Sequence, residues 1–154
     1  MIRLLFRWQF WALILLNHTG VLFAREDLPQ SNKEAKIQRL SLVQDTLILT
    51  HKEDILYFSI RAFAPQGLKN ITIEFLSPSR EKRIIQNYPI ESNKNSKLVL
   101  GHITFTKKSE KGVWTIDRII INCTNGKKVV VAREMLEIQN FSTTILVLGK
   151  GRRY

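Results

Sequence analysis

Residues Val113–Cys123 read VWTIDRIIINC. The first half of this stretch alternates apolar and polar residues, which is typical of a β-strand with one face buried. Trp114 and Ile116 share one face of this strand. The next inward candidates are Ile119 and Ile121, which stand at an odd offset from the first pair.

A β-bulge at Asp117-Arg118 would reconcile these positions, because one inserted residue returns the later side chains to the face of the earlier ones. Directly after the strand, Thr124–Lys127 contains Asn125-Gly126, the strongest short hairpin signal. The stretch therefore predicts a bulged strand that turns back into a second strand over Lys127–Arg133.

The rest of the chain from Leu47 onward has the same period of two. Strands are predicted at 53–63, 68–76, 83–86, 98–106, 113–123, 127–133 and 143–148, with turns at 64–67 and 77–80 and polar loops at 87–97 and 107–112. The first two of these strands are expected to pair antiparallel or to be neighbours across two sheets. Seven to eight strands with turns about every 8–12 residues predict an all-β fold, an antiparallel β-sandwich.

The order of segments also resembles a known family, the immunoglobulin-like domains of exported bacterial proteins. Those domains have a Gly-x-Trp-x-Ile-x-x-Ile-x-Ile strand that runs into an Asp-x-x-Gly-Asn hairpin, and an earlier apolar strand that ends in a Ser-Pro-like turn. Here Asn122 stands in place of the Asp, and Asn125-Gly126 reverses the Gly-Asn order. The matching residues here are Gly112, Trp114, Ile116, Ile119, Ile121, Asn122–Gly126 and Ser77-Pro78, within a resemblance that covers Leu42–Leu148. It implies an immunoglobulin-like binding, adhesion or spacer module with no catalytic residues of its own.

The N-terminal segment, residues 1–24, has the three-part order of a secretory signal peptide. Arg3 and Arg7 precede an apolar run, Trp8–Leu16, and a more polar part ends at Ala24. The run is shorter than the roughly 20 apolar residues that span a bilayer. We expect cleavage after Ala24 and an exported protein, periplasmic, cell-surface or secreted. There are two alternatives for this segment. It could remain as an uncleaved membrane anchor, the one form with a membrane partner, or it could be an ordinary buried helix.

The next segment, residues 25–40, is polar and contains Pro29, which is typical of a linker. Ser31 could instead cap a short helix over Lys33–Leu40. We therefore expect the sandwich domain at residues 41–149 and a basic tail at residues 150–154.

The composition excludes several function classes. One Cys and three His among 154 residues cannot form an internal disulfide, or a closed zinc site without carboxylates. The sequence also has no calcium loop, phosphate loop, nucleophile elbow or close carboxylate pair in an apolar frame. We therefore expect a non-enzymatic protein with no cofactor and no metal.

Cys123 is the one thiol that could act as a nucleophile. Catalysis would need a nearby His and a lowered thiol pKa, and nothing in the spacing brings His51 or His102 toward it. We expect Cys123 and Trp114 to be packed core side chains. An enzyme that uses Cys123, or an intermolecular disulfide through it, is the alternative.

The chain is strongly basic, with 24 Lys and Arg against 13 Asp and Glu and a net charge of +11. Loss of residues 1–24 would remove Arg3 and Arg7 and leave 11 − 2, or +9. Many of the remaining cations lie in predicted turns. The candidate polyanion-binding residues among them are Arg80, Lys82, Arg83, Lys107, Lys108, Lys111, Lys127 and Lys128.

Two functional hypotheses follow. The leading one is an exported, non-enzymatic immunoglobulin-like module that binds a protein partner or associates with the cell envelope. The alternative is a cell-surface protein that binds a polyanion, either an anionic glycan or an anionic lipid, through the turn cations. No nucleic-acid partner is expected, because aromatic residues are not interleaved with the cations and export argues against that ligand.

Overall fold

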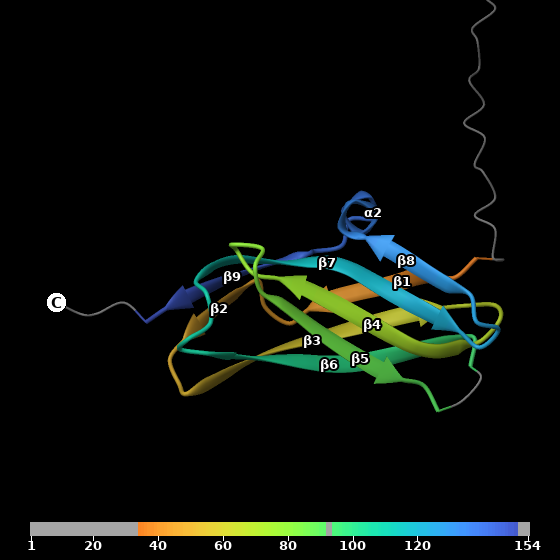
Figure 1. Cartoon of the computed structure of the whole chain (residues 1–154), viewed down its shortest axis with the longest axis horizontal. Helices are drawn as coiled ribbons and strands as arrows, with labels where there is room; N and C mark the ends of the chain where they lie inside the picture. Colours follow the sequence, from red (N-terminus) through yellow and green to blue (C-terminus); the bar gives the residue numbers. More distant parts are fainter. Residues whose placement is uncertain (1–33, 92–93, 151–154) are drawn as a thin grey trace, which may run out of the picture. The chain divides into compact units, whose positions relative to one another are not determined.

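The computed structural model describes residues 34–91 and 94–150. The predicted signal peptide, residues 25–33 of the predicted linker and residues 151–154 of the predicted basic tail therefore lie outside the described residues. Two β-sheets pack face to face into a sandwich (Figure 1). The predicted all-β sandwich is confirmed.

The two sheets differ in size. The three-stranded sheet has the order β1-β3-β6, with β1 at Lys36–Leu42, β3 at Glu53–Phe63 and β6 at Ser96–Thr106. The six-stranded sheet has the order β2-β9-β7-β4-β5, with β8 also paired to β7. Its strands are β2 (Thr46–Leu49), β4 (Leu68–Leu76), β5 (Arg83–Pro89), β7 (Gly112–Cys123), β8 (Lys128–Ala132) and β9 (Thr144–Gly149), and the short helix α2 (Arg133–Ile138) connects β8 to β9.

Strand β7 is the centre of the larger sheet. It pairs with β4 along one side, and on its other side with β9 near its beginning and with β8 near its end. Glu74 lies opposite Arg118 and Phe75 lies opposite Ile116, so Asp117 has no partner on β4. This is the predicted bulge, and it points Ile116 and Ile119 into the same fully buried face.

The core between the sheets is apolar and rich in aromatic side chains. The ring of Phe105 on β6 meets Trp114 on β7 edge to face, with centroids 5.2 Å apart. Phe58 on β3 lies 5.8 Å from Phe75 on β4. Because each pair joins one sheet to the other, these contacts fix the spacing of the sandwich as well as burying area.

The described chain contains nine strands, more than the seven to eight predicted. Strand β1 begins at Lys36, so the linker predicted to residue 40 was too long and the helix over Lys33–Leu40 was wrong. A register irregularity between Ile37 and Arg39 lets Ile37 and Leu40 both face the core at a spacing of three. Because of this irregularity, the apolar residues of β1 do not alternate with a period of two in the sequence, so the strand was not predicted.

Three further details differ from the prediction. Strand β2 pairs with β9 in parallel, so the sandwich is not wholly antiparallel. Strand β5 extends to Pro89, into the predicted polar loop. Helix α2 was not predicted, because Leu136 is its one buried residue and gives no helical stripe. Strands β3 and β4 lie in different sheets, the second of the two arrangements that the sequence left open.

Gly101 on β6 allows a close contact across the sandwich. A Cβ atom built there would lie 2.5 Å from Phe58 Cζ and would also collide with the hydroxyl of Tyr88 on β5. We predict that Gly101→Ala lowers the free energy of unfolding by about 1–3 kcal/mol through overpacking. Urea denaturation measures the change.

The matched control for this prediction is Gly149→Ala at the end of β9. A Cβ there would meet only the flexible Lys111 side chain, at 3.4 Å. Its effect should stay within about 0.5 kcal/mol. Equal effects of the two substitutions would contradict the close contact at Gly101.

Candidate functional site

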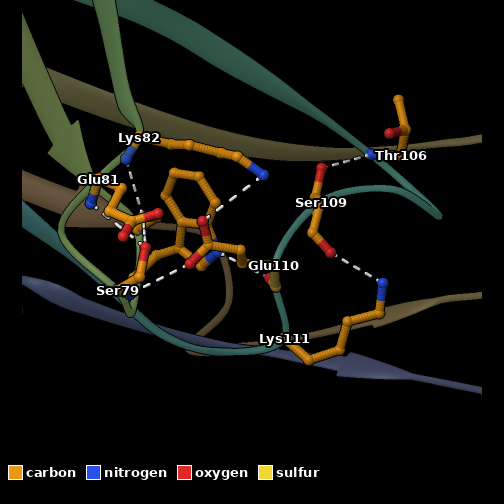
Figure 2. A network of polar contacts seen from close by, with 9 residues as sticks. Ser79, Glu81, Lys82, Thr106, Ser109, Glu110 and Lys111 are labelled. Atoms are coloured by element: carbon orange, nitrogen blue, oxygen red, sulfur yellow. Dashed lines mark hydrogen bonds and ion pairs between the residues drawn. The ribbon is translucent and has the colours of Figure 1, made fainter.

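Two turns that carry predicted polyanion-binding residues lie side by side at one end of the sandwich (Figure 2). The backbone N–H of Ser79 in the β4–β5 turn donates to Glu110 Oε2 in the β6–β7 turn, at 3.1 Å. Lys82 Nζ lies 3.6 Å from the other carboxylate oxygen of Glu110. This end, here named the basic end, is defined by Arg80, Lys82, Arg83, Lys107, Lys108 and Lys111.

Glu110 holds the two turns together. A hydrogen bond from the Ser79 backbone N–H is the main cause that lowers the pKa of the Glu110 carboxyl, and Lys82 adds a smaller effect of the same sign. Burial of Glu110 acts in the opposite direction. The backbone carbonyl of Glu110 also accepts a hydrogen bond from Trp114 Nε1, at 3.0 Å. The turn is therefore tied both to its neighbour and to the core.

The β6–β7 turn is closed by its own side chains. Lys111 Nζ donates to the backbone carbonyls of Lys107 and Ser109, at 2.6 and 2.8 Å. The hydroxyl of Ser109 accepts a hydrogen bond from the N–H of Thr106, at 2.9 Å. With the backbone so held, the side chains of Lys107 and Lys108 remain exposed.

Arg83 is committed to carboxylates on the outer face of the larger sheet. It pairs with Glu74, and its Nη1 lies 3.3 Å from Asp117 Oδ2. Arg118 joins the same acids, 3.3 Å from Glu74 and 2.7 Å from Asp117, and its hydrogen bond to Asp117 raises its pKa. Two cations and two anions cancel, so this network adds little net charge to the basic end.

The sequence reasoning did not identify Glu74 and Asp117 as partners of Arg83. A signal was present, because the alternation of β4 puts Glu74 on the polar face and the bulge turns Asp117 to the same side. Glu74 is 8% exposed, and a carboxylate so buried requires pairing. We assign the network to stability.

A hollow of about 500 Å³ opens at the basic end. Its lining includes three of the cations, Lys82, Arg83 and Lys108, beside the buried ring of Trp114. Among the described residues, four cations of the basic end have no carboxylate within ion-pair distance: Arg80, Lys107, Lys108 and Lys111. All four side chains are exposed, and Lys108 also lines the hollow.

The remaining two candidates, Lys127 and Lys128, lie at the opposite end. They follow the β7–β8 turn, where the Thr124 N–H donates to the Gly67 carbonyl at 3.1 Å and the Thr124 hydroxyl bonds to Gln66 in the β3–β4 turn. The structure therefore joins six of the eight predicted cations and separates these two from them.

Cys123 is 1% exposed and belongs to the core cluster, and Trp114 lies in the same core, as predicted for both. His102 is exposed on β6. His51 is exposed in the β2–β3 turn, where its Nδ1 lies 3.0 Å from Asp54. A buried thiol and two exposed imidazoles do not form a nucleophile and its base.

The described residues contain neither a candidate metal cluster nor a candidate membrane-spanning helix. No group of three or more His, Cys, Asp and Glu side chains there could hold a metal ion. No helix within those ranges has the length and apolar character needed to cross a bilayer.

Comparisons with known proteins place the fold. No protein-family model matches the chain, and no curated protein matches it. Cwp6 from Clostridium difficile matches with a TM-score of 0.51 at 18% identity, over 71% of this chain and 16% of that chain. The CARDB domain of the PF1109 protein from Pyrococcus furiosus, solved in complex with di-metal ions, matches with a TM-score of 0.37 at 8% identity, over 77% of this chain and 97% of that one. At such identities the likeness to Cwp6 shows the fold alone.

The lowered pKa of Glu110 predicts a pH-dependent stability. A carboxyl whose pKa is depressed in the folded state stabilises that state above its unfolded value, about 4.3, and the contribution is lost as pH falls through the folded value. We expect Glu110→Gln to be less stable than the parent at pH 7. The difference should disappear in acid, below the folded pKa. Urea denaturation at several pH values checks this.

Glu81→Gln is the control, because Glu81 lies in the same β4–β5 turn and its carboxylate makes no hydrogen bond or ion pair within the described residues. It should leave the pH profile unchanged. A Glu110→Gln profile parallel to that of the parent would show that this carboxylate does not join the turns.

Proposed function

We propose that this chain is an exported, non-enzymatic, immunoglobulin-like module of the cell envelope that binds an anionic polymer through its basic end. The observation that carries the proposal is that two separate turns bring six cations to one end of the sandwich, where Lys82, Arg83 and Lys108 line a hollow. Four of those cations have no carboxylate partner in the described residues.

The chemistry of the basic end suits a polymer better than a small molecule. Its cations are exposed and spread over two turns, so each can meet a different charge along an extended chain. Binding of this kind gains from the release of counterions and is weakened by salt. A small ligand would need a more enclosed site with convergent polar groups.

Within the polyanions, the basic end favours a soluble anionic glycan over a lipid surface. The turn segments that bear its cations, residues 79–83 and 107–112, contain no large apolar side chain that could enter a membrane. Stable membrane attachment usually combines basic residues with such an anchor. Anionic lipid is therefore the second source of the same chemistry, and the experiment below separates the two.

Export and envelope association rest on other support. The signal-like order of residues 1–24 predicts export. The matched structure of Cwp6, a cell wall protein, agrees with a surface location. The buried Cys123 and the solvent-exposed histidines favour a non-enzymatic role.

A protein partner is the second candidate function, and one observation favours it. Strand β6 forms an open sheet edge with exposed leucines. Such edges recognise other strands through their main chain.

The polymer proposal predicts retention on immobilised heparin that falls steeply with salt. The triple substitution of Arg80, Lys107 and Lys108 by Gln should move elution to clearly lower salt. The slope of log affinity against log salt concentration should become shallower by about one unit for each lost contact. The matched control replaces Lys94, Lys127 and Lys128, which carry the same charge at the opposite end. It should elute like the parent.

Equal losses in the two triple variants would overturn the basic end as the site. A parallel measurement with vesicles that contain phosphatidylglycerol identifies the ligand source. Binding to vesicles without retention on heparin would replace the glycan with an anionic lipid surface.

Export predicts a defined mature N-terminus. Intact-mass analysis of the protein recovered from its host should give a chain that begins at Arg25, because cleavage after Ala24 removes the segment before it. A mass that includes residues 1–24, from a membrane fraction, would indicate an uncleaved anchor instead.

A further inference from the structure

Strand β6 presents outward-facing backbone groups at the open edge of the smaller sheet. The N–H of Val43 donates to the carbonyl of Tyr57 at 3.0 Å, so this carbonyl faces β1 rather than β6. Tyr57 and its partner His102 are therefore a non-hydrogen-bonded pair. The backbone N–H and C=O groups of His102 therefore point away from β3. Because the direction alternates along a strand, the same holds for Leu100 and Leu98.

Two other contacts show the same alternation of backbone groups between β3 and the open edge. The N–H of Ala64 donates to the carbonyl of Asn95 at 2.7 Å, so the odd-numbered residues face β3. Thr106, an even-numbered residue, exchanges both its backbone groups with Ser109 in the turn. Within the described residues, β6 pairs with no strand other than β3.

The composition of this edge sets it apart from the others. Leu98–Thr106 contains no Lys, Arg, Asp or Glu. Strand β1 carries Lys36 and Arg39, β5 carries Arg83, β8 carries Lys128, and β2 has only four residues. Charged side chains and short strands are the usual protection of a sheet edge against pairing with another chain. The longest open edge, β6, has 11 residues and carries one charge, Lys97, next to its first residue, so the stretch from Leu98 onward lacks both kinds of protection.

The side chains that flank the open edge are apolar and exposed. Leu100 is 75% exposed and Leu98 is 40% exposed. Tyr57, on the neighbouring β3 strand, is 54% exposed and stacks obliquely on His102, with ring centroids 6.1 Å apart. Together with His102 these residues form a strip with large exposed side chains on the outer face of the smaller sheet, bordered on β3 by Arg61 opposite Leu98, as expected of an interaction surface.

We propose that β6 pairs antiparallel with β6 of a second copy of this chain, so that two three-stranded sheets join into one six-stranded sheet. The two-fold axis passes beside Val99. Leu98 then lies opposite Leu100 of the second copy, and their outward N–H and C=O groups form the new ladder. The four leucines of the two copies meet on the outer face, where they are now exposed.

The charge distribution selects a second copy as the occupant. Two exported chains, each of net charge +9 after loss of residues 1–24 (11 − 2), repel one another. Contact is therefore favoured where the two surfaces bring no cations together. The ladder centred on Val99 meets this condition, because Lys97 lies opposite Gly101 of the second copy. An acidic peptide would find no cation between Leu98 and Thr106. An isologous contact also uses this self-complementary strip on both partners.

The register centred on Val99 also leaves an existing contact intact. Tyr88 on β5 reaches over Gly101, and its hydroxyl hydrogen-bonds with the backbone of His102. This contact covers the middle of the edge. The main bonds of the proposed ladder lie before it, at Leu98 and Leu100, so Tyr88 need not move.

The experiment is the oligomeric state of the exported protein by sedimentation equilibrium at several salt concentrations. We expect a dimer whose affinity increases with salt, because salt screens the repulsion between like-charged copies and does not weaken an uncharged contact. Leu100→Lys should weaken the dimer at least about tenfold. Val130→Lys, at a similarly strand-borne and half-exposed site on β8, is the control and should dimerise like the parent.

A second variant separates strand pairing from simple face packing. Leu98→Pro removes one outward N–H, which makes no bond in the monomer, so the sandwich should keep its circular-dichroism spectrum and lose the dimer. A monomeric parent at all salt concentrations would overturn the proposal. So would a dimer that survives both β6 substitutions, or one that salt dissociates.

Discussion

The structure depends on the burial of one face of β7. Trp114, Ile116, Ile119 and Ile121 must all enter the core, and a regular strand would send the last two to solvent. The bulge at Asp117 removes that conflict, and its position has effects beyond the core. It lets β9 and β8 share one side of β7, and it brings Asp117 and Arg118 to the outer face beside Glu74 and Arg83. The same residue therefore serves packing, topology and charge pairing.

Local sequence features predicted those parts of the fold that local chemistry determines. The bulge, the Asn125-Gly126 hairpin and the core position of Trp114 each follow from residues within a few positions of one another. Strand β1 was missed because Ile37 and Leu40 face the core across a register irregularity. The parallel pairing of β2 with β9 joins segments far apart in sequence, so no local sequence pattern predicts it.

In the candidate site, too, local sequence predicts the residue types, and the whole fold determines which of them meet. The cations could be named from the sequence, because turns between apolar strands are exposed. Whether two turns meet depends on which sheet each strand enters, and this is a property of the whole fold. Glu110 illustrates the point: in the sequence it is one acid among lysines, and in the structure it bonds Ser79 and Lys82 across the two turns. Lys127 and Lys128, equally basic, lie at the far end.

For the export that we propose, the burial of Cys123 determines when its thiol can be oxidised. Oxidising compartments convert accessible thiols to mixed disulfides or higher oxidation states, and reactivity requires an exposed thiolate. Between synthesis and folding this thiol is open to that chemistry, and after folding it is sealed between the sheets. Folding and oxidation therefore compete for the same sulfur atom. In the native protein, the rate at which a thiol reagent modifies Cys123 would report how often the sandwich opens.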